Sequence, residues 1–177
     1  MSYPLDGHQH LILRKSNRVR RSHSEIVLKE ETVGHHCANV GCIILDLYSP
    51  SYPRCELLAW ALYHDSSEQF TGDMPAPAKW ADEKLRNALR AMDYQWKEER
   101  GFNTTLTSQE RAIAAFADIY DLTLFAQEEI EMGNQFCWDM RDRGYEVVMD
   151  RMGTLDPPYY GRARTWMNVF ERRMTRR

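Results

Sequence analysis

His64 and Asp65 are adjacent, and they directly follow the apolar run 57–62. Two more carboxylates come next, Glu68 and Asp73. Neighbouring side chains on a helix point about 100° apart, so His64 and Asp65 converge on one point only where a helix ends. Imidazole and carboxylate groups are ligands that Zn²⁺, Mn²⁺, Fe²⁺ and Co²⁺ accept. The alternative is an ordinary helix end, with His64 on the last carbonyls and Asp65 opening a turn.

A catalytic metal site needs three or four protein ligands and a position open to water, so further ligands must come from other helices. His35 and His36 interrupt an apolar helical stripe, although a histidine on such a face is more often a hydrogen-bonded core residue. Asp118 lies in one of the most apolar runs, and we expect it to be buried and to need a cation. A salt bridge to an arginine is the alternative. Asp121 competes for the same role but precedes a more polar turn.

Composition narrows the function classes. The chain has 177 residues, 43% of them apolar, and a formal net charge of −3, which argues against non-specific nucleic-acid binding. Two basic clusters, at 14–21 and 162–177, are interpreted as solvated faces or anion contacts. The four cysteines include no Cys-x-x-Cys pair, which indicates free thiols in a reducing compartment. No signal-like or membrane-spanning run occurs, so we expect a cytoplasmic protein without membrane contact.

Apolar periodicity predicts helices throughout the chain. The expected helices span 30–48, 53–64, 80–99, 108–132, 135–152 and 160–176, and a further one opens near Leu11. Ser108 is expected to cap its helix with an incomplete capping box, because Arg111 stands where Glu or Gln is usual. Residues 69–79 are expected to form a loop, and 26–28 a short strand or extended segment. The prediction is an all-α, single-domain compact bundle of six or seven helices spanning 1–177.

The combination of motifs resembles one family. The chain is similar to the HD-domain metal phosphohydrolases, in particular YfbR-type 5′-deoxynucleotidases and the related phage DatZ-type dATP triphosphohydrolases. The resemblance rests on Thr32–Cys37, Ala61–Glu68, Thr71–Lys79 and Ala117–Asp118, which occur in the family's order. It covers about residues 18–130, while the C-terminal helices at 135–177 are matched by the fold alone.

The resemblance implies a role for each matching residue. It assigns the metal ligands to His36, His64, Asp65 and Asp118. It gives Glu68 the acid/base role and Asp73 the discrimination against a ribose 2′-OH. Arg21 and Lys79 are expected to contact the phosphate. His35 stands where the family often has Glu. Ser22 stands where close relatives carry a Trp that covers the base or sugar, so base selection is left open. His23 and Trp80 are candidates for the missing ring.

The implied reaction is metal-dependent cleavage of the phosphorus–O5′ bond of a deoxynucleotide, with one divalent transition metal (Zn, Mn or Co). A second Mg or Mn ion bound with the phosphates is left open. The 14–21 cluster and the short chain favour a dNTP triphosphohydrolase acting on dATP. The alternatives are a 5′-deoxynucleotidase acting on dNMPs and a non-catalytic nucleotide-binding protein. The expected partners are the deoxynucleotide and further copies of the chain in a homo-oligomer, with no nucleic acid.

Overall fold

The computed structural model describes residues 9–175, except the side chains of Ala76, Pro77 and Trp80. Within this range seven α-helices have eight residues or more, in agreement with the six or seven expected. They are α1 (Gln9–Ser16), α2 (Val33–Tyr48), α3 (Cys55–Tyr63), α6 (Glu83–Glu99), α7 (Ser108–Glu131), α8 (Trp138–Met152) and α9 (Pro157–Met174). The shorter helices α4 (Glu68–Thr71) and α5 (Ala76–Ala81) and the 3₁₀ turn η1 (Gln135–Cys137) complete the order, and this part of the chain has no strand.

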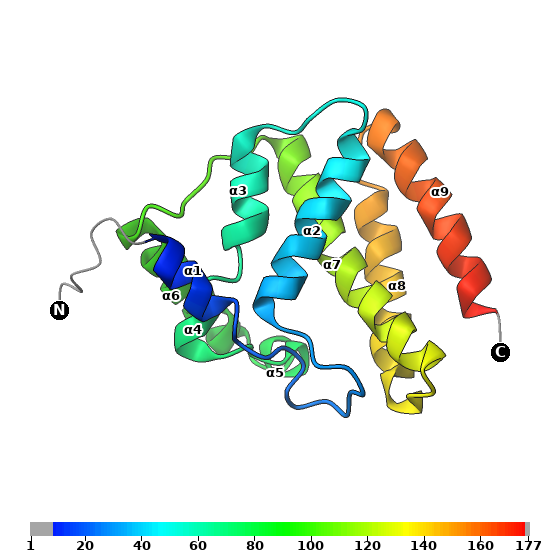
Figure 1. Ribbon diagram of the computed structural model, residues 1–177, viewed down its shortest axis with the longest axis horizontal. Helices are drawn as coiled ribbons and strands as arrows, with labels where there is room; N and C mark the ends of the chain where they lie inside the picture. Colours follow the sequence, from blue (N-terminus) through cyan, green and yellow to red (C-terminus); the bar gives the residue numbers. More distant parts are fainter. Residues whose placement is uncertain (1–8, 176–177) are drawn as a thin grey trace.

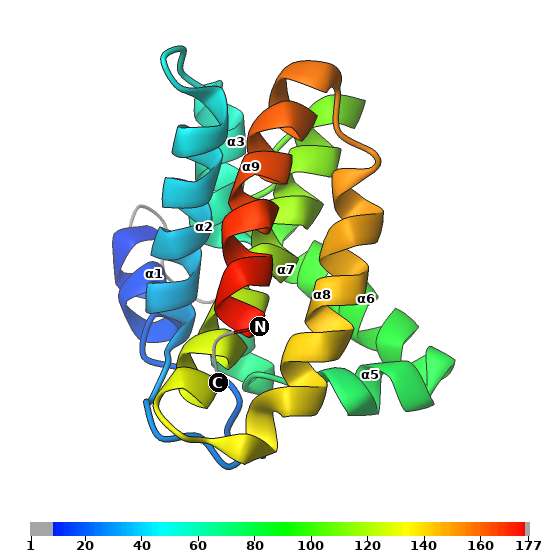
Figure 2. The same ribbon diagram turned by 90° about the vertical axis from the view of Figure 1, so that its right-hand side faces the viewer.

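The long helix α7 organises the bundle. It packs against α8 on one side and against α2 and α3 on another, and α9 contacts α2 and α8. Figures 1 and 2 show α5 and α6 at the same end of the bundle as the N-terminal half of α2. The core contains Val40, Ile44, Leu57, Ile113 and Phe116, all fully buried. The prediction of an all-α bundle is confirmed.

The N-terminus of α7 differs from the sequence-based expectation. Thr107, not Ser108, is the capping residue, and its hydroxyl oxygen accepts from the backbone N–H of Glu110 at 3.2 Å. The Glu110 carboxylate accepts in return from the N–H of Thr107 at 2.7 Å, so the capping box is complete. The prediction of an incomplete box was wrong because it set the helix start one residue too late.

The segment after His64 is also more structured than expected. Residues 69–79 hold α4 and α5 rather than one loop, and α5 is separated from α6 at Asp82. The Asp82 carboxylate accepts from the N–H groups of Lys84 and Leu85, at 2.8 and 3.2 Å, and so begins a new helix. By contrast, Ile26 to Leu28 forms no strand, and both of these residues are largely exposed.

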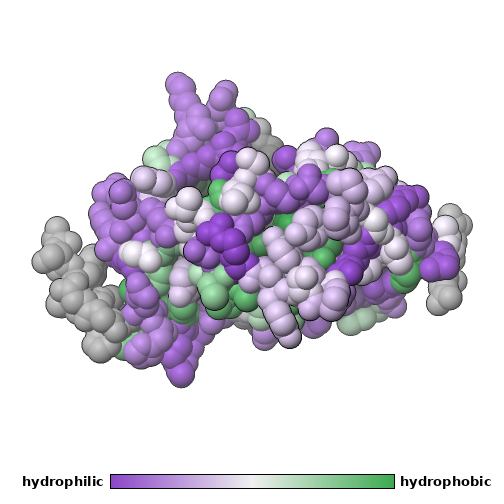
Figure 3. Space-filling model, turned by 90° about the horizontal axis from the view of Figure 1, so that it is seen from above, coloured by the Kyte–Doolittle hydropathy of each residue, from purple (hydrophilic) through white to green (hydrophobic). Residues whose placement is uncertain are grey.

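The face of the bundle seen in Figure 3 is mostly hydrophilic, and its cysteines form no disulfide bonds among the described residues. Viewed from above, hydrophilic residues dominate the surface and hydrophobic ones form only small areas (Figure 3). Within residues 9–175, no helix is both long and apolar enough to span a bilayer. All four cysteines are free, as expected, although only Cys37 and Cys137 are buried.

The α7–α8 interface depends on one close approach. A Cβ placed on Gly144 of α8 would lie 2.4 Å from Thr123 Oγ1 and 3.3 Å from Thr123 Cβ on α7. The Thr123 hydroxyl is fixed because it donates to the carbonyl of Ile119 at 2.7 Å. Gly144 therefore allows α8 to approach α7 closely.

We predict that Gly144→Ala lowers the free energy of unfolding by about 1–3 kcal/mol, because the added methyl overpacks this contact. Thermal or urea denaturation measures the loss. Gly161→Ala on α9, where a Cβ meets nothing within 4 Å, is the matched control and should be neutral or slightly stabilising. Adding Thr123→Ala should recover part of the loss. Equal stability of Gly144→Ala and wild type would contradict the close approach.

Candidate metal centre

The end of α3 sets the orientation of the His64–Asp65 pair. α3 ends at Tyr63, and His64 is its C-cap, with its backbone N–H donating to the carbonyl of Trp60 at 2.8 Å. Asp65 therefore leaves the helix and no longer points about 100° away from its neighbour. The Oδ2 atom of Asp65 lies 3.5 Å from His64 Nε2. The helix end expected from sequence is present, and here it brings the two side chains together.

Four side chains from distant parts of the chain meet at this point. His36, buried on α2, places its Nε2 3.1 Å from His64 Nε2 and 3.6 Å from Asp65 Oδ2. Asp118 on α7 places Oδ1 3.0 Å from His36 Nε2 and 3.9 Å from His64 Nε2. The ligand atoms of His36, His64 and Asp65 all lie within 4.8 Å of one another. The structure thus brings together the four residues named from sequence as metal ligands.

The hydrogen bonds of the two imidazoles fit a metal ion. His36 Nδ1 lies 2.7 Å from Asp121 Oδ2, and His64 Nδ1 lies 2.9 Å from the carbonyl oxygen of Ala61. Both partners are acceptors, so each Nδ1 carries the hydrogen and each neutral ring turns the lone pair of its Nε2 to the other. Two facing lone pairs at 3.1 Å need a proton or a cation between them. Metal-ligating histidines usually make this outer contact to a carboxylate or carbonyl, which fixes the tautomer.

The charges of the cluster favour a cation. Burial opposes protonation of His36, but its hydrogen bonds to Asp118 and Asp121 outweigh that cost and raise its pKa to about 9. Burial likewise opposes protonation of His64, and the charge of Asp65 and contacts with Cys37 and Asp118 raise its pKa to about 9. Loss of solvent contact within the cluster raises the pKa of Asp118, but the hydrogen bond from His36 and the charge of His64 lower it overall. The carboxylates therefore favour positive charge between the two rings, and a divalent ion can take the place of the bound protons.

Asp118 and Asp121, the two candidate carboxylates on α7, differ in burial in the opposite sense to that expected from the sequence. The side chain of Asp118 is 47% exposed, whereas that of Asp121 is only 6% exposed. The expectation that Asp118 is the buried carboxylate and Asp121 the polar one was wrong. Residues three apart share one helix face, so both reach His36, Asp118 from the exposed side and Asp121 from the core side. Sequence reasoning missed Asp121 as the residue that orients His36.

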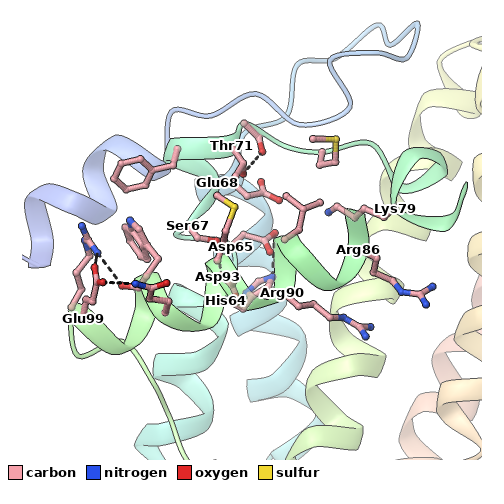
Figure 4. A pocket seen from close by; sticks show the side chains of 18 residues that line it. His64, Asp65, Ser67, Glu68, Thr71, Lys79, Arg86, Arg90, Asp93 and Glu99 are labelled. Atoms are coloured by element: carbon pink, nitrogen blue, oxygen red, sulfur yellow. Dashed lines mark hydrogen bonds and ion pairs between the residues drawn. The ribbon is translucent and has the colours of Figure 1, made fainter. Parts of the chain in front are cut away.

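Glu68 lies at the start of α4, one turn beyond Asp65. Its side chain is buried, and its Oε2 has no hydrogen-bond partner among the described residues. Burial, followed by the charges of Asp65 and Asp73, raises its pKa to about 9. In Figure 4 the carboxyl groups of Glu68 and Asp65 and the side chain of Lys79 point into the same part of the pocket. A divalent ion nearby would lower this pKa, because positive charge favours the carboxylate.

The segment before α2 places Arg21 and Ser22 beside the cluster. Arg21 is largely buried and pairs with Glu31 at 3.3 Å. Burial lowers its pKa, but the charges of Asp65 and Glu31 raise it overall, so the guanidinium stays charged. Ser22 has a positive φ of 53°, and its backbone N–H donates to Asp73 Oδ2 at 2.7 Å. The backbone of Ser22, rather than its side chain, therefore fixes Asp73.

A cavity of about 610 Å³ opens beside these residues and continues along α6. It is lined by Asp65, Glu68 and Lys79 and, farther along, by Phe70 and Trp96 among others. His23 is exposed and does not line it, and the side chain of Trp80 lies outside the described residues. Trp96 lies within the helix expected over 80–99, and nothing in its sequence context marks it as a cavity residue.

Comparison with known proteins agrees with this geometry. The sequence matches the model of the YfbR-like 5′-deoxynucleotidase family over residues 9–155. It is 31% identical over 90 residues to 5′-deoxynucleotidase PM0747 of Pasteurella multocida, a match that covers 42% of this chain and 46% of that protein. The match thus spans about half the length of this curated relative.

Solved structures with a similar fold include two HD-domain phosphohydrolases. One is lin2634 of Listeria innocua, with a TM-score of 0.70 and 19% identity over 86% of this chain and 82% of that chain. The other is the cyanophage S-2L HD phosphohydrolase DatZ bound to dA and one catalytic Zn²⁺ ion. Its TM-score is 0.70, with 20% identity over 92% of this chain and 94% of that chain. The predicted HD-domain fold is confirmed.

We predict that the purified protein binds about one divalent transition-metal ion per chain and that His64→Ala or Asp118→Ala loses it, because each change removes a donor from the cluster. Elemental analysis after dialysis measures the occupancy. His35→Ala, which removes an exposed imidazole next to His36, is the matched control and should keep the ion. Full occupancy in the first two variants would contradict this ligand set.

Proposed function

The chain belongs to the YfbR-like 5′-deoxynucleotidase family, and from this membership we propose that it is a metal-dependent phosphohydrolase that cleaves the phosphorus–O5′ bond of a deoxynucleotide. The observation that carries the proposal is the convergence of His36, His64, Asp65 and Asp118 on one point at the mouth of a cavity, with Glu68 beside them. A set of metal ligands and a separate carboxyl group that can act as an acid thus lie next to each other in one open site, as metal-dependent hydrolysis requires.

The cofactor is one divalent transition metal, Zn, Mn or Co, held by the four ligands. When bound, such an ion lowers the pKa of a coordinated water and polarises a phosphoryl oxygen. The Zn²⁺ ion of the DatZ structure supports this choice, and two imidazoles with two carboxylates suit the same metals. Asp121 and the carbonyl of Ala61 keep the Nδ1 hydrogens in place, so both Nε2 lone pairs stay available.

Glu68 is the general acid of the proposed reaction. Its carboxyl group is buried beside the proposed metal ligands, and its Oε2 has no hydrogen-bond partner among the described residues, so it can pass a proton to a leaving group. As a water oxygen bonds to phosphorus, the phosphorus–O5′ bond breaks and the Glu68 proton passes to O5′. A proton released by the attacking water returns to the Glu68 carboxylate, so the residue is ready for the next turnover. The products are a deoxynucleoside and the released phosphate or triphosphate.

Arg21, Lys79 and Asp73 bind the rest of the substrate. Arg21 and Lys79 supply positive charge for the phosphate, the first as a planar fork and the second as a point charge. The N–H of Ser22 occupies Oδ2 of Asp73, which leaves Oδ1 to accept a hydrogen bond from the sugar 3′-OH. A ribose 2′-OH would crowd this carboxylate, so a deoxyribose is preferred.

The number of phosphates distinguishes two versions of the reaction. A triphosphohydrolase acting on dATP is supported by the cations that line the cavity, and its adenine base by the dA bound to DatZ. A 5′-deoxynucleotidase acting on dNMPs is equally supported, by the family and by the relative from Pasteurella multocida. Self-association of the chain stays a prediction.

Two other functions are less well supported. A non-catalytic nucleotide-binding protein would not need the four ligands together with Glu68, and all five are present. Nucleic-acid binding would need free cations, but the basic C-terminal helix is partly neutralised. Arg173 pairs with Glu131 at 2.8 Å, and Arg164 pairs with Glu171 at 3.1 Å.

We predict that the protein loaded with Mn²⁺, Co²⁺ or Zn²⁺ hydrolyses deoxynucleotides, and that Glu68→Gln keeps the metal but loses about 10²-fold or more in kcat because it cannot donate the proton. A panel of dNMPs, dNTPs and ribonucleotides, with phosphate and triphosphate resolved, measures the activity. His35→Ala is the control. Absence of turnover on the whole panel would overturn the proposed function, and near-wild-type rates in Glu68→Gln would remove this residue from the mechanism.

We predict that wild type prefers deoxy over ribo substrates and that Asp73→Asn relaxes this preference, because an amide no longer matches the Ser22 N–H and the sugar hydroxyl in the same way. The ratio of kcat/KM for dATP and ATP, or dAMP and AMP, measures the effect. Ser22→Ala keeps the backbone N–H and should leave the ratio unchanged. Equal turnover of both sugars by wild type would contradict the role of Asp73.

A further inference from the structure

Two arginines on α6 line the cavity beyond Lys79. Arg86 and Arg90 are four residues apart, so they share one face of the helix one turn from each other. Both line the same 610 Å³ cavity as Asp65 and Glu68. Figure 4 shows their side chains projecting from α6 at the end of the pocket to which Lys79 also belongs. Three cations therefore occupy one end of the cavity that contains the metal centre.

These arginines lack strong partners in the protein. Among the described residues, Arg86 is within ion-pair distance of Glu83 alone, at 3.6 Å. The Glu83 carboxylate is largely exposed, so this pair contributes little. The Nε atom of Arg86 is buried without a hydrogen-bond partner among the described residues. No carboxylate of the described chain lies within 4.0 Å of the Arg90 guanidinium. Two like charges one turn apart repel each other, so an anion bound between them would relieve this repulsion.

The acidic groups at the other end of the cavity are already paired. Asp93 accepts from Lys97 Nζ at 2.7 Å, and Glu99 accepts from Arg100 at 3.1 Å. Arg100 also lies over the Trp96 ring, 4.7 Å from its centroid. The aromatic end of the cavity is thus balanced in charge. In Figure 4 Lys79 faces Glu68 and Asp65, and the positive charge that remains in the cavity is concentrated at Arg86 and Arg90 beyond it.

The basic cluster near the N-terminus does not provide this charge. Arg14 and Arg18 are exposed, Arg20 pairs with Glu30 at 2.9 Å, and none of them lines the cavity. Of the 14–21 cluster, only Arg21 lies beside the metal ligands. The sequence-based suggestion that the whole cluster holds a triphosphate therefore loses its structural support.

We propose that Arg86 and Arg90, together with Lys79, form the binding site for the β- and γ-phosphates of a deoxynucleoside triphosphate. The inference rests on the proposed function, which places the α-phosphate at the metal centre. The remaining phosphates extend along α6, where each guanidinium presents a planar fork to phosphate oxygens. A monophosphate ends at the metal centre and makes no contact with Arg86 or Arg90. The two arginines therefore select for the triphosphate.

The test compares dATP with dAMP in the double variant Arg86→Gln/Arg90→Gln. The kcat/KM for dATP should fall about 10- to 100-fold, because charge-assisted hydrogen bonds to the distal phosphates are lost, while that for dAMP stays within about twofold. The matched control is Arg14→Gln/Arg18→Gln, which removes the same charge from exposed positions outside the cavity. Equal losses on both substrates, or no loss on dATP, would overturn the proposal.

Binding of inorganic tripolyphosphate to the metal-loaded protein, measured by calorimetry, separates this inference from the proposed function. Affinity that falls about tenfold or more in the Arg86→Gln/Arg90→Gln variant, but not in the control, supports the subsite even if no nucleotide is hydrolysed. Turnover of dAMP without tripolyphosphate binding would overturn the subsite and leave the proposed function intact. A 5′-phosphorylated oligonucleotide that binds more tightly than dATP would show that the arginines serve a nucleic-acid end and would also overturn the proposal.

Discussion

The two Nε2 atoms of His36 and His64 face each other at 3.1 Å, and the rest of the site depends on what lies between them. Asp121 and the carbonyl of Ala61 accept hydrogen bonds from the Nδ1 atoms of His36 and His64. Neither neutral ring can therefore move its hydrogen to Nε2 to remove the repulsion between the two Nε2 lone pairs. A cation resolves the conflict, and the carboxylates of Asp65 and Asp118 supply charge to hold it. Thus the hydrogen bonds behind the histidines, as much as the donors themselves, suit this cluster to a metal ion.

The residues proposed to bind the substrate depend on a second buried carboxylate, far from the cluster. Glu129 near the end of α7 accepts from the backbone N–H groups of Leu28 and Lys29, at 2.6 and 2.8 Å, and from the side chain of Asn134 at 2.7 Å. These bonds tie the irregular segment before α2 to the bundle. That segment carries Arg21 and Ser22, so its position fixes both the guanidinium beside the metal ligands and the N–H that holds Asp73.

The full set of four ligands came from the resemblance to the HD-domain family, whereas the residues themselves predicted the helices through apolar periodicity and suggested a metal site where a helix ends at His64 and Asp65. The sequence did not distinguish Asp118 from Asp121, because residues three apart share a helix face and only the packing of α2 decides which one is buried. Arg86 and Arg90 have the spacing of any solvated helix face. They line a cavity because the helix breaks at Asp82, which sets the direction of α6. The sequence does not show which part of the chain α6 then faces.

The wall of the cavity is joined to the metal centre by polar contacts. Lys97 of α6 donates to the carbonyl of His64 and to Asp93, and Asp93 accepts from the hydroxyl of Ser67. α6 is therefore tied to the turn that presents His64 and Asp65, and the helix that carries Arg86 and Arg90 keeps a fixed distance from the ligands. The buried Trp96 of α6 adds apolar packing against Ile12 of α1 and against Phe102. Polar bonds and apolar packing together therefore restrain the cavity's length, and with it the number of phosphates that the proposed subsite could hold.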